Sequence, residues 1–259
     1  MLLLSLYVRR FFGPSLASLL EDAPSDADRT RLRSAVGRGA WAWLTPPPIV
    51  AALQFARELF LIALRTRLGQ PQLGAAAYLT CEGRWPLDAL GVHLLRCPHG
   101  GGTTAAHDVV RDAVVSIASE ADFRVGREQR HLLPRARPDG AHRRVDLLFT
   151  DNAGGRSLGD VVVADPTCSD HIVCCARPSG LGVAARLAAS RKHRAYSDLF
   201  PGDAFRPLAV ETYGCLDGPF DDFLRECARR AVASGTTSTS SSTLACFFRQ
   251  RISVALQRA

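Results

Sequence analysis

Residues 144–166 read RVDLLFTDNAGGRSLGDVVVADP and decide the fold, because they predict two buried strands that each carry a carboxylate. Asp146 stands before the apolar run LLF, Asp160 stands before VVVA, and a glycine-rich turn separates the two runs. Strands of this composition are usually buried on both faces, where an unpaired carboxylate is costly unless it meets a cation or a metal ion. Because the short turn would make the strands neighbours, we expect the two carboxylates to form a divalent metal site.

Helical and strand-like patterns continue on both sides of this hairpin. Apolar residues recur at helical or alternating spacing in five further segments: 105–121 (helix), 123–128 (strand), 182–200 (helix), 205–213 (strand) and 219–232 (helix). The order of these elements predicts an α/β layer arrangement. Lys192, four residues before Tyr196, lies on the apolar stripe of the helix at 182–200, where a charged side chain is unusual.

Composition divides the chain into five segments. They are a helical linker region (1–78), a segment with cysteine and histidine residues (79–104), the α/β core (105–233), a Ser/Thr-rich linker (234–243) and a basic amphipathic C-terminal helix (244–259). Within the first segment, three consecutive prolines block a helix and allow one to begin after them. We therefore expect a helix over residues 49–68 that ends at Gly69.

The composition also bounds the partners and the compartment. The 259 residues are 47% hydrophobic and carry a formal net charge of +7, mostly from arginine, which suits phosphate and makes DNA, or RNA, the natural partner. Eight irregularly placed cysteines, with Cys174 and Cys175 adjacent, indicate a reducing compartment, nuclear or cytoplasmic. The apolar run that opens the chain is too short to span a bilayer, and no other segment suits a membrane.

Several familiar catalytic motifs are absent from the sequence. There is no YxDD-type polymerase motif, P-loop, GxGxxG, nucleophile elbow or HExxH. The usual sequence support is therefore lacking for polymerisation, nucleotide hydrolysis, dinucleotide chemistry, serine hydrolysis and classical zinc proteolysis.

A family resemblance rests on several runs that occur in one order along the chain. They are CEGRWPLDALGVHLLRCPHGG, HDVVRDAV, RVDLLF, GDVVVADP, the pair Lys192 and Tyr196, PLAVETYG and RQRISVALQRA. This pattern resembles the C-terminal region of non-LTR retrotransposon reverse transcriptase polyproteins, in which a zinc knuckle and a restriction-like endonuclease follow the polymerase. The resemblance covers residues 37–259 and is strongest over 79–214. It implies a PD-(D/E)XK restriction-endonuclease-like α/β core with a helical N-terminal extension, which nicks target DNA to prime reverse transcription.

The resemblance assigns the catalytic roles residue by residue. Asp146 takes the place of the Asp in the PD pair, with Val145 in place of the proline, and Asp160 is the second acid. Both would hold Mg²⁺. Val162 stands where the usual strand lysine would be, but the family moves that lysine to the following helix, where Lys192 occupies its place. Lys192 would stabilise the developing phosphorane charge or lower the pKa of the attacking water, and Tyr196 would brace the helix.

One further departure and one weak match accompany these assignments. The second lysine of the family's KxxKY run is Ala195 here. Glu128, ahead of the first acid, resembles an additional glutamate that some such nucleases use. His107, Arg111 and Glu211 are polar residues in predicted elements that would support the site.

A zinc knuckle is the second site that the resemblance implies. Cys81, His93 and Cys97 supply three ligands of a CCHC set, while Gly83 and Arg84 stand where a partner cysteine would be. His99 or His107 are candidates for the fourth ligand, which the sequence does not identify. The alternative is that the two cysteines are ordinary buried thiols.

Four arginines are candidates for contacts to nucleic acid. Arg143, Arg144, Arg249 and Arg251 would track backbone phosphates without reading sequence. Structural roles remain open for the acids: Asp160 as a turn cap, and Asp146 as a partner of a nearby arginine (Arg143, Arg144 or Arg156). Two other functions also remain open, namely a nucleic-acid-binding remnant without turnover and a protein-interaction module that uses the helices beginning at Pro219 and Leu244.

Overall fold

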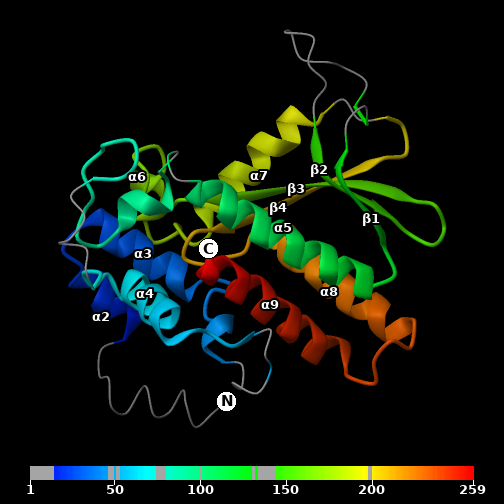
Figure 1. The fold of residues 1–259 in the computed structure, drawn as a ribbon, viewed down its shortest axis with the longest axis horizontal. Helices are drawn as coiled ribbons and strands as arrows, with labels where there is room; N and C mark the ends of the chain where they lie inside the picture. The colour runs from blue at the N-terminus through cyan, green and yellow to red at the C-terminus, as the bar shows by residue number, and fades with distance from the viewer. Residues whose placement is uncertain are drawn as a thin grey trace.

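The computed structural model describes residues 15–45, 50, 53–73, 80–97, 99, 101–129, 132–133, 144–197 and 200–259. Within these ranges the chain forms a mixed α/β structure around one four-stranded sheet (Figure 1). The predicted α/β class is therefore confirmed.

The sheet has the strand order β1-β2-β3-β4, which follows the sequence. Its strands are β1 (Arg124–Gln129), β2 (Val145–Thr150), β3 (Arg156–Ala164) and β4 (Ala204–Glu211). β2 pairs antiparallel with both β1 and β3, and β4 pairs with β3 in parallel. A tight turn joins β2 to β3, because Oδ1 of Asp151 accepts the N–H groups of Ala153 (2.9 Å) and Gly155 (2.8 Å). The hairpin predicted for 144–166 is therefore confirmed.

Helices cover both faces of the sheet. The helices of the described residues are α2 (Leu16–Glu21), α3 (Asp26–Val36), α4 (Arg57–Leu68), α5 (Gly102–Glu120), α6 (Ile172–Cys175), α7 (Val183–Ala195), α8 (Gly218–Ala233) and α9 (Ser241–Arg258), with short 3₁₀ turns η1 (Ala42–Leu44) and η4 (Val92–Leu95). The helices predicted at 105–121, 182–200 and 219–232 correspond to α5, α7 and α8, but α7 ends at Ala195 and not at residue 200, so Tyr196 lies just beyond it. In Figure 1, α5, α8 and α9 lie side by side, and contacts between each pair agree with this view.

The main hydrophobic core lies between these three helices and one face of the sheet. It joins apolar residues of α5, β2, β3, β4, α8 and α9: Val114, Ile117, Phe149, Val161, Leu208, Phe223 and Phe248 are representative. Val161 faces this core, whereas its neighbour Val162 packs against alanines of α7. Because side chains alternate along a strand, α7 covers the opposite face. Strand β3 is thus covered on both faces, as its apolar run predicts, whereas the edge strand β1 is partly exposed.

The predicted N-terminal helix is shorter in the structure. It begins at Arg57 in place of residue 49, and residues 46–49, 51 and 52 lie outside the described residues. Gly69 ends it as predicted, with a left-handed φ of 64° that a residue with a side chain rarely adopts. Buried Arg67 then ties α4 to the rest of the molecule, since its guanidinium donates to the carbonyls of Ala35, Ala40 and Tyr213.

The last helix begins within the predicted linker. Ser240 caps α9 by accepting the N–H of Thr243 at 3.2 Å, so the end of the Ser/Thr-rich stretch forms the first helical turn. The inward side chains of α9 belong to the main core, and Val254 also packs with Trp43 and Leu53. Helix α9 therefore joins the sheet-covering layer to the N-terminal helices.

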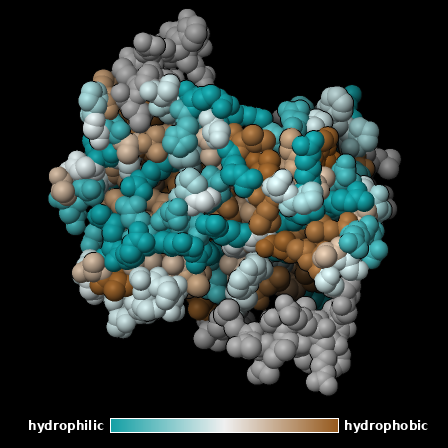
Figure 2. Space-filling model, turned by 180° about the vertical axis from the view of Figure 1, so that it is seen from behind, coloured by the Kyte–Doolittle hydropathy of each residue, from teal (hydrophilic) through white to brown (hydrophobic). Residues whose placement is uncertain are grey.

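Hydrophobic surface is unevenly distributed. Most of the large exposed apolar side chains precede residue 100, among them Ile62, Leu73 and Trp85. Seen from behind, the molecule shows brown hydrophobic areas interrupted by teal hydrophilic ones (Figure 2). Among the described residues, no helix combines the length and apolar character needed to span a membrane.

Candidate functional site

The two predicted carboxylates lie side by side in the sheet. Leu147 pairs with Gly159 in the antiparallel register of β2 and β3, so the next positions, Asp146 and Asp160, face each other across the strands. Asp146 is 8% exposed and Asp160 is 2% exposed. The sequence prediction that the turn would bring these acids together is confirmed.

Asp160 receives an ion pair and a hydrogen bond from α7. Nζ of Lys192 lies 2.7 Å from Oδ1, and the hydroxyl of Tyr196 donates to Oδ2 at 2.5 Å. Burial raises the pKa of Asp160, the negative charge of Asp146 raises it further, and Lys192 opposes both effects. The structure therefore brings together three of the four predicted catalytic residues around one carboxylate.

Asp146, the fourth, has different partners. Nε2 of His107, from α5, lies 2.9 Å from Oδ2, which also accepts the N–H of Val161 at 2.9 Å. Burial alone would raise the pKa of Asp146, but the hydrogen bond and charge of His107 lower it overall. The same hydrogen bond raises the pKa of His107, against the effect of burial. The two adjacent acids are thus shifted in opposite directions, which favours ionised Asp146 beside a more easily protonated Asp160.

Lys192 is the only lysine in a chain with 32 lysine and arginine residues. Its side chain is 35% exposed, so the ammonium reaches the buried carboxylate from an accessible side of α7. An ammonium is a compact point charge that can approach a water molecule or a phosphate oxygen where the wider guanidinium fork would not fit. The single lysine of the chain therefore occurs at the one place where the resemblance implies a catalytic lysine.

Tyr196 fixes the end of α7 against the sheet. Its N–H donates to the carbonyl of Lys192 at 2.9 Å, and its ring stacks on Phe205 of β4 with centroids 4.5 Å apart. The bracing contact predicted for Tyr196 is present, and it is made to the carboxylate as well as to the helix. Lys192 and Tyr196 are consequently held in one geometry relative to Asp160.

The arginines proposed as alternative partners of Asp146 have other contacts. Arg144 pairs with Glu128 at 3.4 Å, and Arg156 pairs with Asp203 at 3.0 Å. Asp160 lies inside β3 and does not cap a turn. Arg143 lies outside the described residues.

The remaining supporting residues fall into two groups. Arg111 joins the cluster around Glu128, with which it pairs at 3.0 Å. Glu211 is 1% exposed and accepts the N–H groups of Ala184 (3.0 Å) and Ala185 (3.4 Å). It thereby satisfies the first turn of α7, the helix that carries Lys192.

The arrangement places two buried carboxylates on adjacent strands, each in contact with a side chain from a covering helix. An imidazole and an ammonium flank them, and these can hold or move a proton near a bound water. Sequence reasoning proposed His107 only as a supporting residue or zinc ligand, because nothing in the HDVVRDAV pattern shows that α5 passes Asp146.

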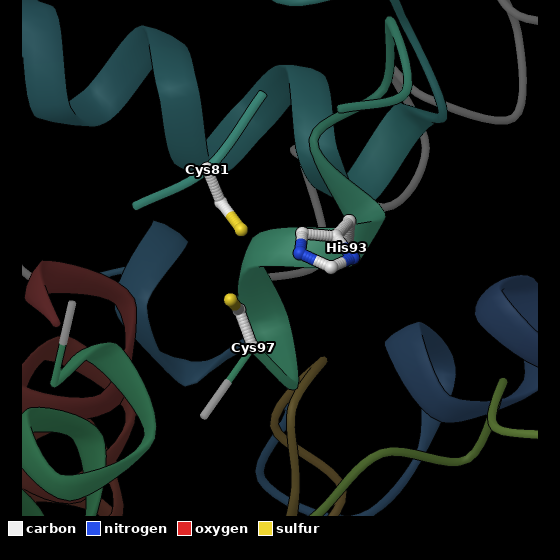
Figure 3. A group of neighbouring side chains, drawn as sticks. All are labelled: Cys81, His93 and Cys97. Carbon is white, nitrogen blue, oxygen red and sulfur yellow. The ribbon is translucent and has the colours of Figure 1, made fainter. Parts of the chain in front are cut away.

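The second predicted group, Cys81, His93 and Cys97, also converges. The metal-ligating atoms of these residues all lie within 4.8 Å of one another. In Figure 3 the two sulfur atoms point toward each other with the His93 imidazole beside them. Sulfur and imidazole nitrogen are the ligands that zinc prefers, so this cluster could bind a metal such as zinc.

Local hydrogen bonds position this cluster. The carboxylate of Asp88 accepts the N–H groups of Leu90, Val92 and His93, which fixes the turn that precedes η4. The desolvation of Cys81 would raise its pKa, but hydrogen bonds from the backbone of Trp85 and from His93 lower the pKa to about 7. A lowered pKa favours the thiolate, which is the form that binds metal.

Neither proposed fourth ligand joins the three residues. His107 is bound to Asp146, as described above. The ring of His99 packs on Gly83, where an added Cβ would fall 2.2 Å from Cδ2 of the imidazole. Within the described part of the chain, the metal-capable group consists of the two cysteines and His93.

Three of the four arginines predicted to contact nucleic acid have protein partners, and Arg143 lies outside the described residues. Arg249 pairs with Asp221 at 2.5 Å, and Arg251 pairs with Glu120 at 2.7 Å. These contacts join α9 to α8 and α5. The paired residues are far apart in the sequence, so the helical periodicity of α9 does not predict these ion pairs.

Comparison with known proteins adds no relative. No protein-family model matches the chain, and a search of curated proteins finds no match.

Proposed function

We propose that the protein is a metal-dependent DNA endonuclease of retrotransposon origin, with its active centre at Asp146 and Asp160. The observation that carries the proposal is the contact between the only lysine of the chain and Asp160, next to a second buried acid. A metal-dependent phosphodiesterase needs carboxylates for the ion and a cation for the phosphate charge, and these residue types meet here.

The fold supports the same reading. The resemblance implies a PD-(D/E)XK-type core, in which the acids stand on adjacent strands and the lysine comes from the following helix. Here the acids stand on β2 and β3, and Lys192 stands on α7, the long helix that follows β3. Both acids are buried in the sheet. Electrostatic contacts made to them are stronger than in water, because the effective dielectric constant of the interior is lower.

The residues of the chain divide the proposed chemistry among them. Mg²⁺ bound by Asp146 and Asp160 would activate a water and neutralise phosphate charge. Lys192 would place its ammonium beside the scissile phosphate and stabilise the charge that develops on its oxygens. Tyr196 and His107 would hold the two carboxylates in orientation through the hydrogen bonds at 2.5 Å and 2.9 Å.

The cysteine and histidine cluster has a structural role in this proposal. Zinc held by Cys81, His93 and Cys97 would fix the segment at 80–97. This segment is attached to the core near the end of β3, because Arg96 lies 3.7 Å from Asp165. The zinc would thus stabilise a surface beside the nuclease core without taking part in the reaction.

A plasmid-nicking assay tests the proposal directly. Supercoiled plasmid is incubated with Mg²⁺ and either wild type, Asp146→Asn, Asp160→Asn or Lys192→Ala, with the exposed Asp170→Asn as a matched control. We expect wild type and the control to nick the plasmid and the other three variants to lose most activity. Equal rates for all five proteins would contradict the proposal.

The assay also separates the two other functions. A remnant without turnover is favoured by the departures at Val145 and Ala195, and it predicts salt-dependent DNA binding with no nicking by wild type. An interaction module built on α8 and α9 is disfavoured, because the apolar faces of both helices are buried in the main core.

A further inference from the structure

A second charged feature lies away from the carboxylate pair, between α8 and α9. It is a hollow of about 340 Å³, called here the arginine hollow. Its polar lining comprises Arg225, Arg229 and Arg249 together with Ser241, Ser242 and Cys246. Three arginines thus line one space at the surface.

Asp221 organises the arginines from beneath. It is fully buried and pairs with Arg249 at 2.5 Å, Arg225 at 2.9 Å and Arg38 at 3.3 Å. A single carboxylate cannot neutralise three guanidinium groups, so the cluster keeps excess positive charge. The buried acid also fixes the orientation of its partners, which lowers the entropy lost when they bind an anion.

Arg229 adds a cation with no internal partner. It is exposed on α8, one turn after Arg225, and forms no hydrogen bond or ion pair with another described residue. A further acid, Asp222, is 70% exposed and lies 3.8 Å from Arg225, where solvent weakens the pair. Capacity to bind an external anion therefore remains in the hollow.

The first turn of α9 contributes the remaining donors. Ser241 and Ser242 are the first two residues of this 18-residue helix, and their hydroxyl groups can donate hydrogen bonds. A helix of this length places partial positive charge at its N-terminus, which favours phosphate. Guanidinium groups and the N–H groups of a helix N-terminus donate hydrogen bonds from several directions. They therefore suit the tetrahedral oxygens of a phosphate better than they suit a planar carboxylate.

We propose that the arginine hollow binds a phosphate group, and that this phosphate belongs to the backbone of DNA. The binding of phosphate follows from the hollow itself, whereas the choice of DNA as its source rests on the proposed function. The hollow adds a backbone contact outside the carboxylate pair, and it orients the duplex without reading its sequence.

Binding of a labelled DNA duplex, measured by fluorescence anisotropy in EDTA, tests the contact without cleavage. Arg229→Gln and the double variant Arg225→Gln/Arg229→Gln are compared with Arg57→Gln/Arg177→Gln, a control that removes two exposed arginines elsewhere. We expect the slope of log affinity against log salt to fall by about 1 for each phosphate that the variant no longer neutralises, with weaker binding at all sequences. If the control variant loses as much DNA affinity and as much salt dependence as the double variant, the arginine hollow makes no specific contact with DNA.

Cys246 provides a second measurement on the unmodified protein. Its thiol is exposed in the hollow, 3.8 Å from Nη1 of Arg249, and Cys174 is an exposed reference thiol elsewhere. Bound duplex should slow alkylation of Cys246 by iodoacetamide, read by mass spectrometry, and leave Cys174 unchanged. Equal protection by inorganic phosphate at the same phosphate concentration would overturn DNA as the source. Protection by neither would overturn the site.

These results are separable from the test of the nuclease. A protein that binds duplex through the hollow but never nicks DNA would contradict the proposed function and leave the hollow supported. Normal nicking with Cys246 unprotected and unchanged salt slopes would contradict the hollow alone.

Discussion

Nζ of Lys192 lies 2.7 Å from Oδ1 of Asp160, so the only lysine of the chain is joined to the more deeply buried of two adjacent acids. In ordinary surface ion pairs, arginine and lysine often substitute for each other with little effect. At this position the two should differ, because the space beside a buried carboxylate suits a compact ammonium.

The first prediction concerns this difference. Lys192→Ala should reduce the nicking rate by about a hundredfold, since it removes the cation that faces the developing phosphate charge. Lys192→Arg keeps the charge but should recover only part of the activity. Single-turnover nicking at saturating Mg²⁺ measures both, with Arg191→Gln as the neighbouring control. Full activity of Lys192→Ala would remove the lysine from the mechanism.

The second prediction concerns His107, which sequence reasoning did not place beside Asp146. His107→Ala should lower the nicking rate by roughly tenfold and the free energy of unfolding by about 1 kcal/mol, because Asp146 loses a hydrogen-bond partner. His107→Gln keeps a donor at a similar position and should restore part of both. Nicking rates and urea unfolding curves provide the comparison. An unchanged rate for His107→Ala would show that Asp146 needs no support from α5.

The third prediction concerns the pH dependence of stability at Asp221. Burial alone would raise the pKa of this acid, but Arg249, Arg225 and Arg38 lower it overall. A carboxylate with a lowered folded-state pKa stabilises the fold above its unfolded pKa of about 3.9, and this contribution is lost as the pH falls through the folded value. Asp221→Asn should therefore cost about 3 kcal/mol at pH 7.

The difference between Asp221→Asn and wild type should begin to shrink below about pH 4 and continue to shrink until the pH reaches the lowered folded-state pKa of Asp221. Urea unfolding at several pH values measures it, with the exposed Asp170→Asn as the control. A difference that stays constant from pH 7 to pH 3 would show that the arginines do not depend on the charge of Asp221.

The fourth prediction concerns zinc. The purified protein should contain about one zinc ion per chain, and Cys81→Ser or Cys97→Ser should lose it. The exposed Cys246→Ser is the matched control and should retain the metal. Elemental analysis gives the zinc content, and hydrogen exchange should become faster over residues 80–97 after chelation. If wild type contains no zinc and chelation leaves its hydrogen exchange unchanged, Cys81 and Cys97 are ordinary thiols that bind no metal.

The central hairpin could be predicted because its information is local. The glycine-rich turn and the two apolar runs determine that β2 and β3 pair, and side-chain alternation then places Asp146 opposite Asp160. Lys192 stands out by its place on the apolar stripe of α7 and by the resemblance. The hairpin and the stripe position each need only a few neighbouring residues, whereas the resemblance draws on runs along most of the chain.

The partners of charged residues could not be predicted in the same way. Asp221 reads as part of the polar face of an amphipathic helix, yet it is fully buried under arginines from α9 and from the segment after α3. Arg251 reads as a free basic residue but pairs with Glu120, far away in sequence. These pairs depend on how helices pack, and helical periodicity does not encode which helix will be the neighbour.

The solitary lysine has a consequence for covalent modification. Enzymes that acetylate lysine, or attach ubiquitin to it, find one side-chain target in these 259 residues, and that target is paired with Asp160. Acylation of Lys192 would remove its charge, so the same reaction that marks the chain would also inactivate the proposed nuclease. The rate at which an amine-reactive label modifies this side chain would accordingly report how often the ammonium separates from Asp160.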